Sequence, residues 1–194
     1  PITASRYVCG DFYNRELNNM WRKTWHISGL SYQAPEEGDY LVAEIGPESV
    51  IVVRRDDGTF SGYLNVCPHR GARVTEGPDG YAQRFTCPYH GWEFDLGGRV
   101  VSVPGALDFK HGNPCSKLGL QPVLVEELFG MVWFNIDLHS VSLKEYLGQT
   151  IFEEIGAYRI DEMVRVLDMT AETHCNWKIL SDNFNEAYHL QVVH

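Results

Sequence analysis

Apolar residues follow two different spacings along this chain, and the change occurs near residue 40. Between residues 11 and 25 the apolar positions are three and four residues apart, which predicts one amphipathic helix. Beyond residue 40, short runs rich in valine, isoleucine and tyrosine alternate with turn residues such as Asp57-Gly58, as in strands and hairpins. The strands predicted in this way cover residues 40–45, 49–54, 60–66, 84–86, 93–95, 123–127 and 131–135.

The pattern changes again after residue 137. Residues 142–147 are predicted to form a short helix, and residues 164–169 a strand. Between residues 176 and 194 the large apolar side chains are again three and four residues apart, which predicts a helix with one buried stripe. The predicted organisation is a helical segment, an all-β domain and the first part of a larger domain, with the boundaries 1–35, 36–136 and 137–194.

Composition narrows the class of protein. The chain has 194 residues, of which 44% are hydrophobic and 22% charged, so we expect a packed core. Its net charge of −10 is unfavourable for nonspecific binding to nucleic acid or to an anionic membrane surface. No apolar run approaches the roughly 18 residues of a membrane span. We therefore expect neither nucleic acid nor a membrane as a partner.

Two cysteines and two histidines form two short motifs, Cys67-Pro-His69 and Cys87-Pro-Tyr-His90, both in loops between predicted strands. Two thiolates and two imidazoles are the ligands of a Rieske [2Fe–2S] cluster, in which the cysteines hold one iron and the histidines the other. A zinc ribbon also uses four such ligands, but usually as Cys-x2-Cys or His-x3–5-His pairs, a spacing that differs from this one. Chance placement in loops is the other alternative.

Three further cysteines, Cys9, Cys115 and Cys175, remain once the cluster ligands are set aside. An odd remainder is more typical of free thiols in a reducing compartment than of a disulfide scaffold. We therefore expect a cytoplasmic protein.

A second candidate metal site lies near the end of the sequence. His189 and His194 are five residues apart, about 500° on a regular helix, so they share a face only if the helix ends or unwinds between them. Two histidines and one carboxylate can bind non-haem Fe(II) and leave positions open for O₂ and substrate. Taken alone, the two histidines could also be ordinary polar residues.

Together these motifs resemble those of Rieske ring-hydroxylating oxygenases, in the N-terminal half of the terminal oxygenase alpha subunit. Both cluster motifs with their following Gly, and the string from 182 to 189 followed by His194, are similar to the motifs of that family. High-potential respiratory Rieske proteins carry an extra cysteine in each loop and a serine after the second His-Gly. Because Ala72, Tyr89 and Trp92 stand at those places, we expect a reduction potential at the low end of the Rieske range, about −150 mV.

The resemblance implies an α+β fold, in which an all-β Rieske domain is inserted into a helix-grip-like catalytic domain that is only partly present in this chain. It also implies that His189 and His194 bind a mononuclear Fe(II), whose third ligand is a carboxylate absent from this sequence. Glu186 stands where the family has a bridging carboxylate, usually aspartate, that accepts a hydrogen bond from a Rieske histidine of the neighbouring subunit. Asn183 and Tyr188 stand at positions that line or support the site, although Tyr188 could equally serve helix packing.

The activity that the resemblance implies is that of an NAD(P)H-driven oxygenase. A reductase or ferredoxin would donate electrons, and O₂ and a small organic, aromatic substrate would react at the iron. A homotrimer is expected, with or without a β subunit. Two alternatives stay open. An N- or O-demethylating monooxygenase is favoured slightly by Glu186, and a Rieske ferredoxin would need only residues 36–136.

Overall fold

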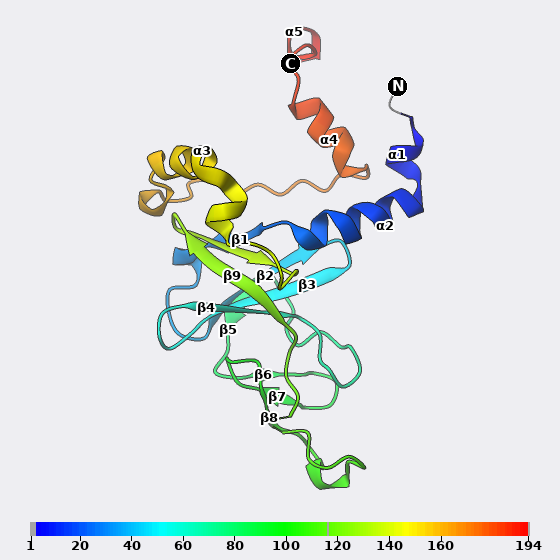
Figure 1. Cartoon of the computed structure of the whole chain (residues 1–194), viewed down its shortest axis with the longest axis vertical. Coiled ribbons are helices and arrows are strands. Elements are labelled where there is room, and N and C mark those ends of the chain that lie inside the picture. Colours follow the sequence, from blue (N-terminus) through cyan, green and yellow to red (C-terminus); the bar gives the residue numbers. More distant parts are fainter. Residues whose placement is uncertain (1–2, 116, 194) are drawn as a thin grey trace. The chain divides into compact units, whose positions relative to one another are not determined.

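The computed structural model describes residues 3–115 and 117–193, which form two compact units (Figure 1). The larger unit runs from Arg22 to Met163, and the smaller unit joins the N-terminal segment as far as Trp21 to the C-terminal segment from Val164. The larger unit is mostly β and the smaller one helical, which confirms the predicted α+β class. The domain boundaries at 35/36 and 136/137 stay a prediction.

Antiparallel sheets form the framework of the larger unit. The main sheet has seven strands among the described residues, in the order β1-β10-β9-β4-β3-β2-β5. The three-stranded sheet β6-β7-β8 lies at the end of this unit away from helix α3 (Figure 1). The strands are β1 (His26–Leu30), β2 (Asp39–Ile45), β3 (Glu48–Arg54), β4 (Phe60–Leu64), β5 (Asp79–Tyr81), β6 (Phe85–Thr86), β7 (Glu93–Phe94), β8 (Val100–Ser102), β9 (Pro122–Leu128) and β10 (Met131–Asn135).

Strand β3, near the centre of the main sheet, packs in the same core as the cysteines of the two Cys/His motifs. Strand β3 is buried over residues 49–53 because it lies between β2 and β4 and is covered on both faces. Ile51 and Val53 belong to the apolar core that also contains Cys67 and Cys87. The same apolar core therefore buries both the centre of the sheet and the two cysteines.

The seven strands predicted between residues 40 and 135 are all present, with ends shifted by at most two residues. The predicted turn at Asp57-Gly58 is also confirmed, because the Arg55 N–H donates to the Thr59 carbonyl at 2.7 Å and Gly58 has φ +78°. Strands β1, β5 and β8 were not predicted from the pattern. Two of them have only three residues, and Gly29 interrupts the apolar pattern of β1.

Helix α3 (Leu143–Ala157) is longer than the predicted helix at 142–147. It begins at Ser142, whose hydroxyl accepts a hydrogen bond from the Glu145 N–H at 3.3 Å. Gly148, with φ +72°, divides it at a kink. No helix in the described part of the chain is both long enough and apolar enough to cross a membrane.

The predicted helix at 11–25 is wrong in its second half. Helices α1 (Ser5–Val8) and α2 (Gly10–Asn19) are followed by a 3-10 turn at Trp21–Lys23 and by β1. The cause is Trp25, which is buried in the larger unit with Met131 and Trp133. Its indole N–H donates to the Val141 carbonyl at 3.2 Å, so the chain has already left the helix there.

Two further predictions beyond residue 160 are wrong. Residues 164–169 form no strand in the structure, and Val166 is 91% exposed, because no neighbouring strand among the described residues pairs with them. The predicted helix at 176–194 is two helices, α4 (Trp177–Phe184) and α5 (Leu190–Val193). Phe184 and Tyr188 are exposed, so the predicted buried stripe is absent from these described residues. His194 lies outside the described residues.

Candidate metal centres

The two Cys/His motifs fold into loops with the same hydrogen-bond pattern. In loop 1 (residues 67–72), the Cys67 N–H donates to the Ala72 carbonyl at 2.8 Å, and the Gly71 N–H donates to the Cys67 carbonyl at 2.9 Å. Gly71 has φ +73°, a left-handed conformation that favours glycine. The glycine after each histidine motif is therefore needed for the backbone to close the loop.

Loop 2 (residues 87–92) repeats this pattern. The Cys87 N–H donates to the Trp92 carbonyl at 2.8 Å, the Gly91 N–H donates to the Cys87 carbonyl at 2.9 Å, and Gly91 has φ +67°. Each loop places a cysteine at its first position and a histidine at its third or fourth. The main chain thus brings two matching ligand arms together from different parts of the sequence.

The two loops supply a pair of thiols and a pair of imidazoles. Cys67 and Cys87 are each 2% exposed and share one apolar core. Burial raises the pKa of Cys67, the nearby Cys87 thiol adds to the increase, and the backbone N–H groups of His69 and Arg70 oppose it. The rings of His69 and His90 have centroids 4.6 Å apart.

The two like pairs of donors are the ligand set of a two-iron Rieske cluster. Nδ1 of His69 and Nδ1 of His90 are both buried, and neither has a hydrogen-bond partner among the described residues. A buried nitrogen without a partner costs free energy, and coordination of a metal removes that cost. Within the described residues, no three His, Cys, Asp or Glu side chains gather as a site for one metal ion. The donor set and its division into pairs fit a Rieske [2Fe–2S] cluster.

Two aromatic rings lie against the His69 imidazole, and the sequence pattern did not predict these contacts. Trp92 stacks on His69 with centroids 5.0 Å apart and planes 5° from parallel, and Phe109 meets His69 edge-on at 6.4 Å. Removal from water lowers the pKa of His90, and His69 and Arg70 act in the same direction. A lowered pKa favours the neutral imidazole, the form that binds metals. Trp92 follows the second His-Gly directly, which could have indicated its role, whereas Phe109 carried no signal.

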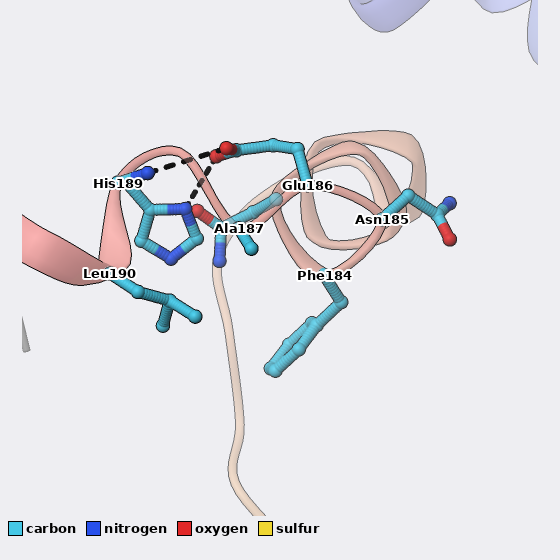
Figure 2. Close-up of a pocket in the computed structure, with 7 residues that line it drawn as sticks. Phe184, Asn185, Glu186, Ala187, His189 and Leu190 are labelled. Carbon is cyan, nitrogen blue, oxygen red and sulfur yellow. Dashed lines mark hydrogen bonds and ion pairs between the residues drawn. The ribbon is translucent and has the colours of Figure 1, made fainter.

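The second candidate site lies in the turn between α4 and α5. Helix α4 begins at Asn176, whose side-chain oxygen accepts a hydrogen bond from the Lys178 N–H at 3.0 Å, and it ends at Phe184. The turn that follows borders a pocket of about 410 Å³ (Figure 2). The pocket is lined by Asn183, Phe184, Asn185, Glu186, Ala187, His189 and Leu190.

Glu186 and His189 both line this pocket, and their side chains point toward each other and are in contact (Figure 2). Oε1 of Glu186 contacts Nδ1 of His189, and Oε2 accepts hydrogen bonds from the backbone N–H groups of Tyr188 and His189. The hydrogen bond with His189 is the main cause of the lowered pKa of Glu186. A carboxylate on Nδ1 fixes the tautomer and raises the basicity of the ring, so the coordinating atom of His189 would be Nε2.

The other predicted site residues are placed differently. Asn183 lines the pocket with Glu186 and His189. The side chain of Tyr188 is 95% exposed and does not line this pocket. In the part of the chain that the structure describes, no group of three potential ligands surrounds His189.

Helix α4 is fixed by contacts that no local pattern could indicate, because they join residues more than 150 positions apart. Nζ of Lys178 lies 2.8 Å from both carboxylate oxygens of Glu16. The Tyr7 hydroxyl donates to Asp182 at 2.8 Å, and this hydrogen bond raises the pKa of Tyr7. Both residues of each pair belong to the smaller unit, so the N-terminal helices position the helix that leads to His189.

Comparison with known protein families gives a match for the segment with the two Cys/His motifs and another for the segment with His189. Residues 24–111 match the family described as Rieske [2Fe-2S] domain. Residues 160–194 match the family described as ring hydroxylating alpha subunit (catalytic domain).

Individual relatives agree with these matches. The alpha subunit of benzene 1,2-dioxygenase from Pseudomonas putida is 31% identical over 199 residues, covering 94% of this chain and 42% of the relative. The oxygenase subunit of carnitine monooxygenase from Escherichia coli is 30% identical over 196 residues, covering 100% of this chain and 52% of the relative. A solved quaternary ammonium Rieske monooxygenase with gamma-butyrobetaine has a TM-score of 0.87 and 26% identity, covering 98% of this chain and 55% of that chain.

A mostly-β unit with paired thiols and paired imidazoles, followed in sequence by a segment that matches a catalytic domain, defines a protein of the Rieske iron–sulfur class. More particularly, the chain belongs to the family of Rieske ring-hydroxylating oxygenase alpha subunits. It spans about half the length of the curated relatives it matches.

Proposed function

We propose that this chain belongs to the terminal oxygenase component of a multicomponent Rieske oxygenase. Its reaction would be the hydroxylation of a small organic substrate with O₂, using electrons from a separate reductase or ferredoxin. The observation that carries this proposal is that the two cysteines share one buried core and the two imidazoles lie side by side, with both histidine Nδ1 atoms buried and unpartnered among the described residues.

The proposed ligands divide between the two centres. Residues Cys67, His69, Cys87 and His90 would hold the [2Fe–2S] cluster, and His189 and His194 would hold Fe(II). When bound, these groups would supply one-electron transfer and O₂ activation, respectively. Loops 1 and 2 keep the cysteines out of water, and Trp92 restricts the orientation of the His69 ring.

Glu186 is the proposed bridging carboxylate. Its contact with His189 supports this role, because it fixes the ring at the pocket. Its side chain remains 45% exposed, so a Rieske histidine of a neighbouring subunit could also donate to it. Electron transfer between subunits requires a head-to-tail ring, and we propose a homotrimer, with or without a β subunit. Asn183 and Tyr188 are proposed as residues that support this site.

The substrate class has two candidates. The benzene dioxygenase relative supports an aromatic substrate. A demethylating or quaternary-amine monooxygenase is favoured by Glu186 in place of the usual aspartate, and by the likeness over 98% of the chain to the quaternary ammonium enzyme. Product analysis separates the two, because an arene dioxygenase releases a cis-diol and a demethylase releases formaldehyde. A cytoplasmic location is also proposed, and the three cysteines outside the proposed cluster support it, because none of them forms a disulfide in the described structure.

The proposal is tested by counting iron and inorganic sulfide in the reduced protein and recording its EPR spectrum. About three irons and two sulfides per chain with a Rieske-type signal are expected. Two irons and two sulfides, with no O₂ uptake after Fe(II) is added, would instead favour an electron carrier. A protein that binds zinc and no sulfide would overturn the proposal.

A further inference from the structure

Asn65 is a fully buried polar residue two positions before Cys67. Its Oδ1 accepts hydrogen bonds from the N–H groups of Val74 and Thr75, at 2.8 and 3.0 Å. Its Nδ2 donates to the Thr75 carbonyl at 2.9 Å and to the Ser49 hydroxyl at 3.1 Å. An amide side chain has two donor and two acceptor positions, so all of its hydrogen-bonding capacity is used.

These bonds join the two arms of loop 1. Asn65 precedes the loop, and Val74 and Thr75 follow it, so the side chain closes the base of the loop from the inside. The Asn65 N–H also donates to the Ser49 carbonyl at 2.7 Å, which fixes the same residue to strand β3. The base of loop 1 is thus tied to the rigid centre of the main sheet.

The polar contacts continue outward and return to the loop. The Ser49 hydroxyl donates to Glu44 at 3.0 Å. Arg73, immediately after loop 1, donates to both oxygens of Glu44 at 2.7 and 2.9 Å. Loop 1 is therefore held by the buried hydrogen bonds of Asn65 and by the exposed ion pair of Arg73 with Glu44. The Ser49 hydroxyl joins the two sets, because it accepts from Asn65 and donates to Glu44.

Loop 2 is held differently. The position two residues before Cys87 is occupied by Phe85, which is 1% exposed and packs in the apolar core. Apolar packing carries little directional restraint, whereas four hydrogen bonds fix an amide in one orientation. Loop 1 consequently depends on one polar side chain in a way that loop 2 does not.

We propose that Asn65 is a positioning residue for the cluster, which fixes loop 1 and thereby the placement of Cys67 and His69. The inference rests on the [2Fe–2S] cluster proposed above. Residues that orient metal ligands from outside typically change metal affinity by about tenfold or more when they are replaced. Loss of the Asn65 bonds should therefore weaken cluster retention and change the electronic environment of the ligands, beyond any general loss of stability.

The test compares Asn65→Ala with Asn135→Ala. Asn135 is also fully buried and hydrogen-bonded, with its Nδ2 donating to Lys23 and its Oδ1 accepting from Asp137, but it lies on β10, two strands from β4. Both variants should lose thermal stability. Only Asn65→Ala should release iron to a chelator about tenfold faster, with altered EPR g-values and a shifted reduction potential.

Equal g-values, potentials and release rates in the two variants would overturn the inference. If Asn65→Ala does not fold, Ser49→Ala decides the question, because it removes only the hydroxyl that links Asn65 to Glu44. A smaller change in the same cluster signals is then expected, and unchanged signals would reject the positioning role. A wild-type protein without a [2Fe–2S] signal would instead refute the proposed function, so the two failures are distinct.

Discussion

Glu186 directs its two carboxylate oxygens to different donors, one to the His189 ring and one to backbone N–H groups. The backbone contacts hold the side chain in place, so the ring contact can be tested by a change that preserves shape. Glu186→Gln keeps the size of the side chain and removes its charge. The amide oxygen can still accept hydrogen bonds and the amide nitrogen cannot, so one set of contacts is kept and the pocket should keep its form.

Glu186→Gln is expected to leave both metals bound and to reduce turnover by about tenfold or more, because a bridging carboxylate acts through its charge. Iron content, sulfide content and substrate oxidation are measured on the same preparation. Asn185→Ala, a neighbouring change in the pocket lining, serves as the control. Full turnover by Glu186→Gln would reject the bridging role.

The cluster potential is a second property decided by single residues. Trp92 occupies the position from which a serine would donate a hydroxyl toward the cluster, and its ring stacks on His69 instead. Without that donor, the reduced cluster is less stabilised, and we expect a midpoint potential of about −150 mV. A redox titration followed by EPR measures it. A clearly positive midpoint would mean that other hydrogen bonds compensate.

At the scale of elements, the ion pair between Lys178 and Glu16 ties α4 to α2. Their side chains are only 15% and 12% exposed, so removal of one partner leaves the other charge nearly buried. Lys178→Met should lower the stability of the smaller unit by about 3 kcal/mol. Hydrogen exchange of the α4 amides, measured in increasing urea, reports this loss.

The matched control is Arg165→Ala, which breaks an exposed pair with Asp168 in the same unit. An exposed ion pair contributes about 0–1 kcal/mol, so this variant should differ little from wild type. If both variants exchange alike, the buried pair does not fix α4.

The helices and strands differ in how well the sequence pattern predicted them. Strand β3 was predictable because its apolar run is continuous and turn residues bound it. The helix at 11–25 was predicted too long because the burial of Trp25 in another unit leaves no trace in local spacing. The strand at 164–169 failed because a strand needs a partner, and none of the described residues provides one.

The candidate site divides in the same way. Cys67, His69, Cys87 and His90 could be proposed as ligands from spacing, because these residues and the turns that carry them are close in sequence. Asn65, Lys178 and Tyr7 could not, because their roles arise from contacts made only after folding. Local chemistry was predictable, and the long-range restraints on it were not.

At the scale of the whole molecule, the four proposed cluster ligands and the core beneath them all lie in the unit Arg22–Met163. A fragment of residues 22–163 is therefore expected to fold and to bind the [2Fe–2S] cluster. Two irons and two sulfides with the EPR signal of the whole chain are the predicted result. An unfolded fragment would show that the cluster domain needs the segments outside this unit.

The common hydrogen-bond pattern of loops 1 and 2 has a consequence for how such a centre can change. Both are six-residue frames that begin with cysteine and carry glycine at the fifth position, yet the histidine stands third in one and fourth in the other. The positions that close the loop are thus the same in both motifs, while the position of the histidine differs. The same closing hydrogen bonds form with the imidazole at either position, so closure of the loop does not depend on which position carries the histidine.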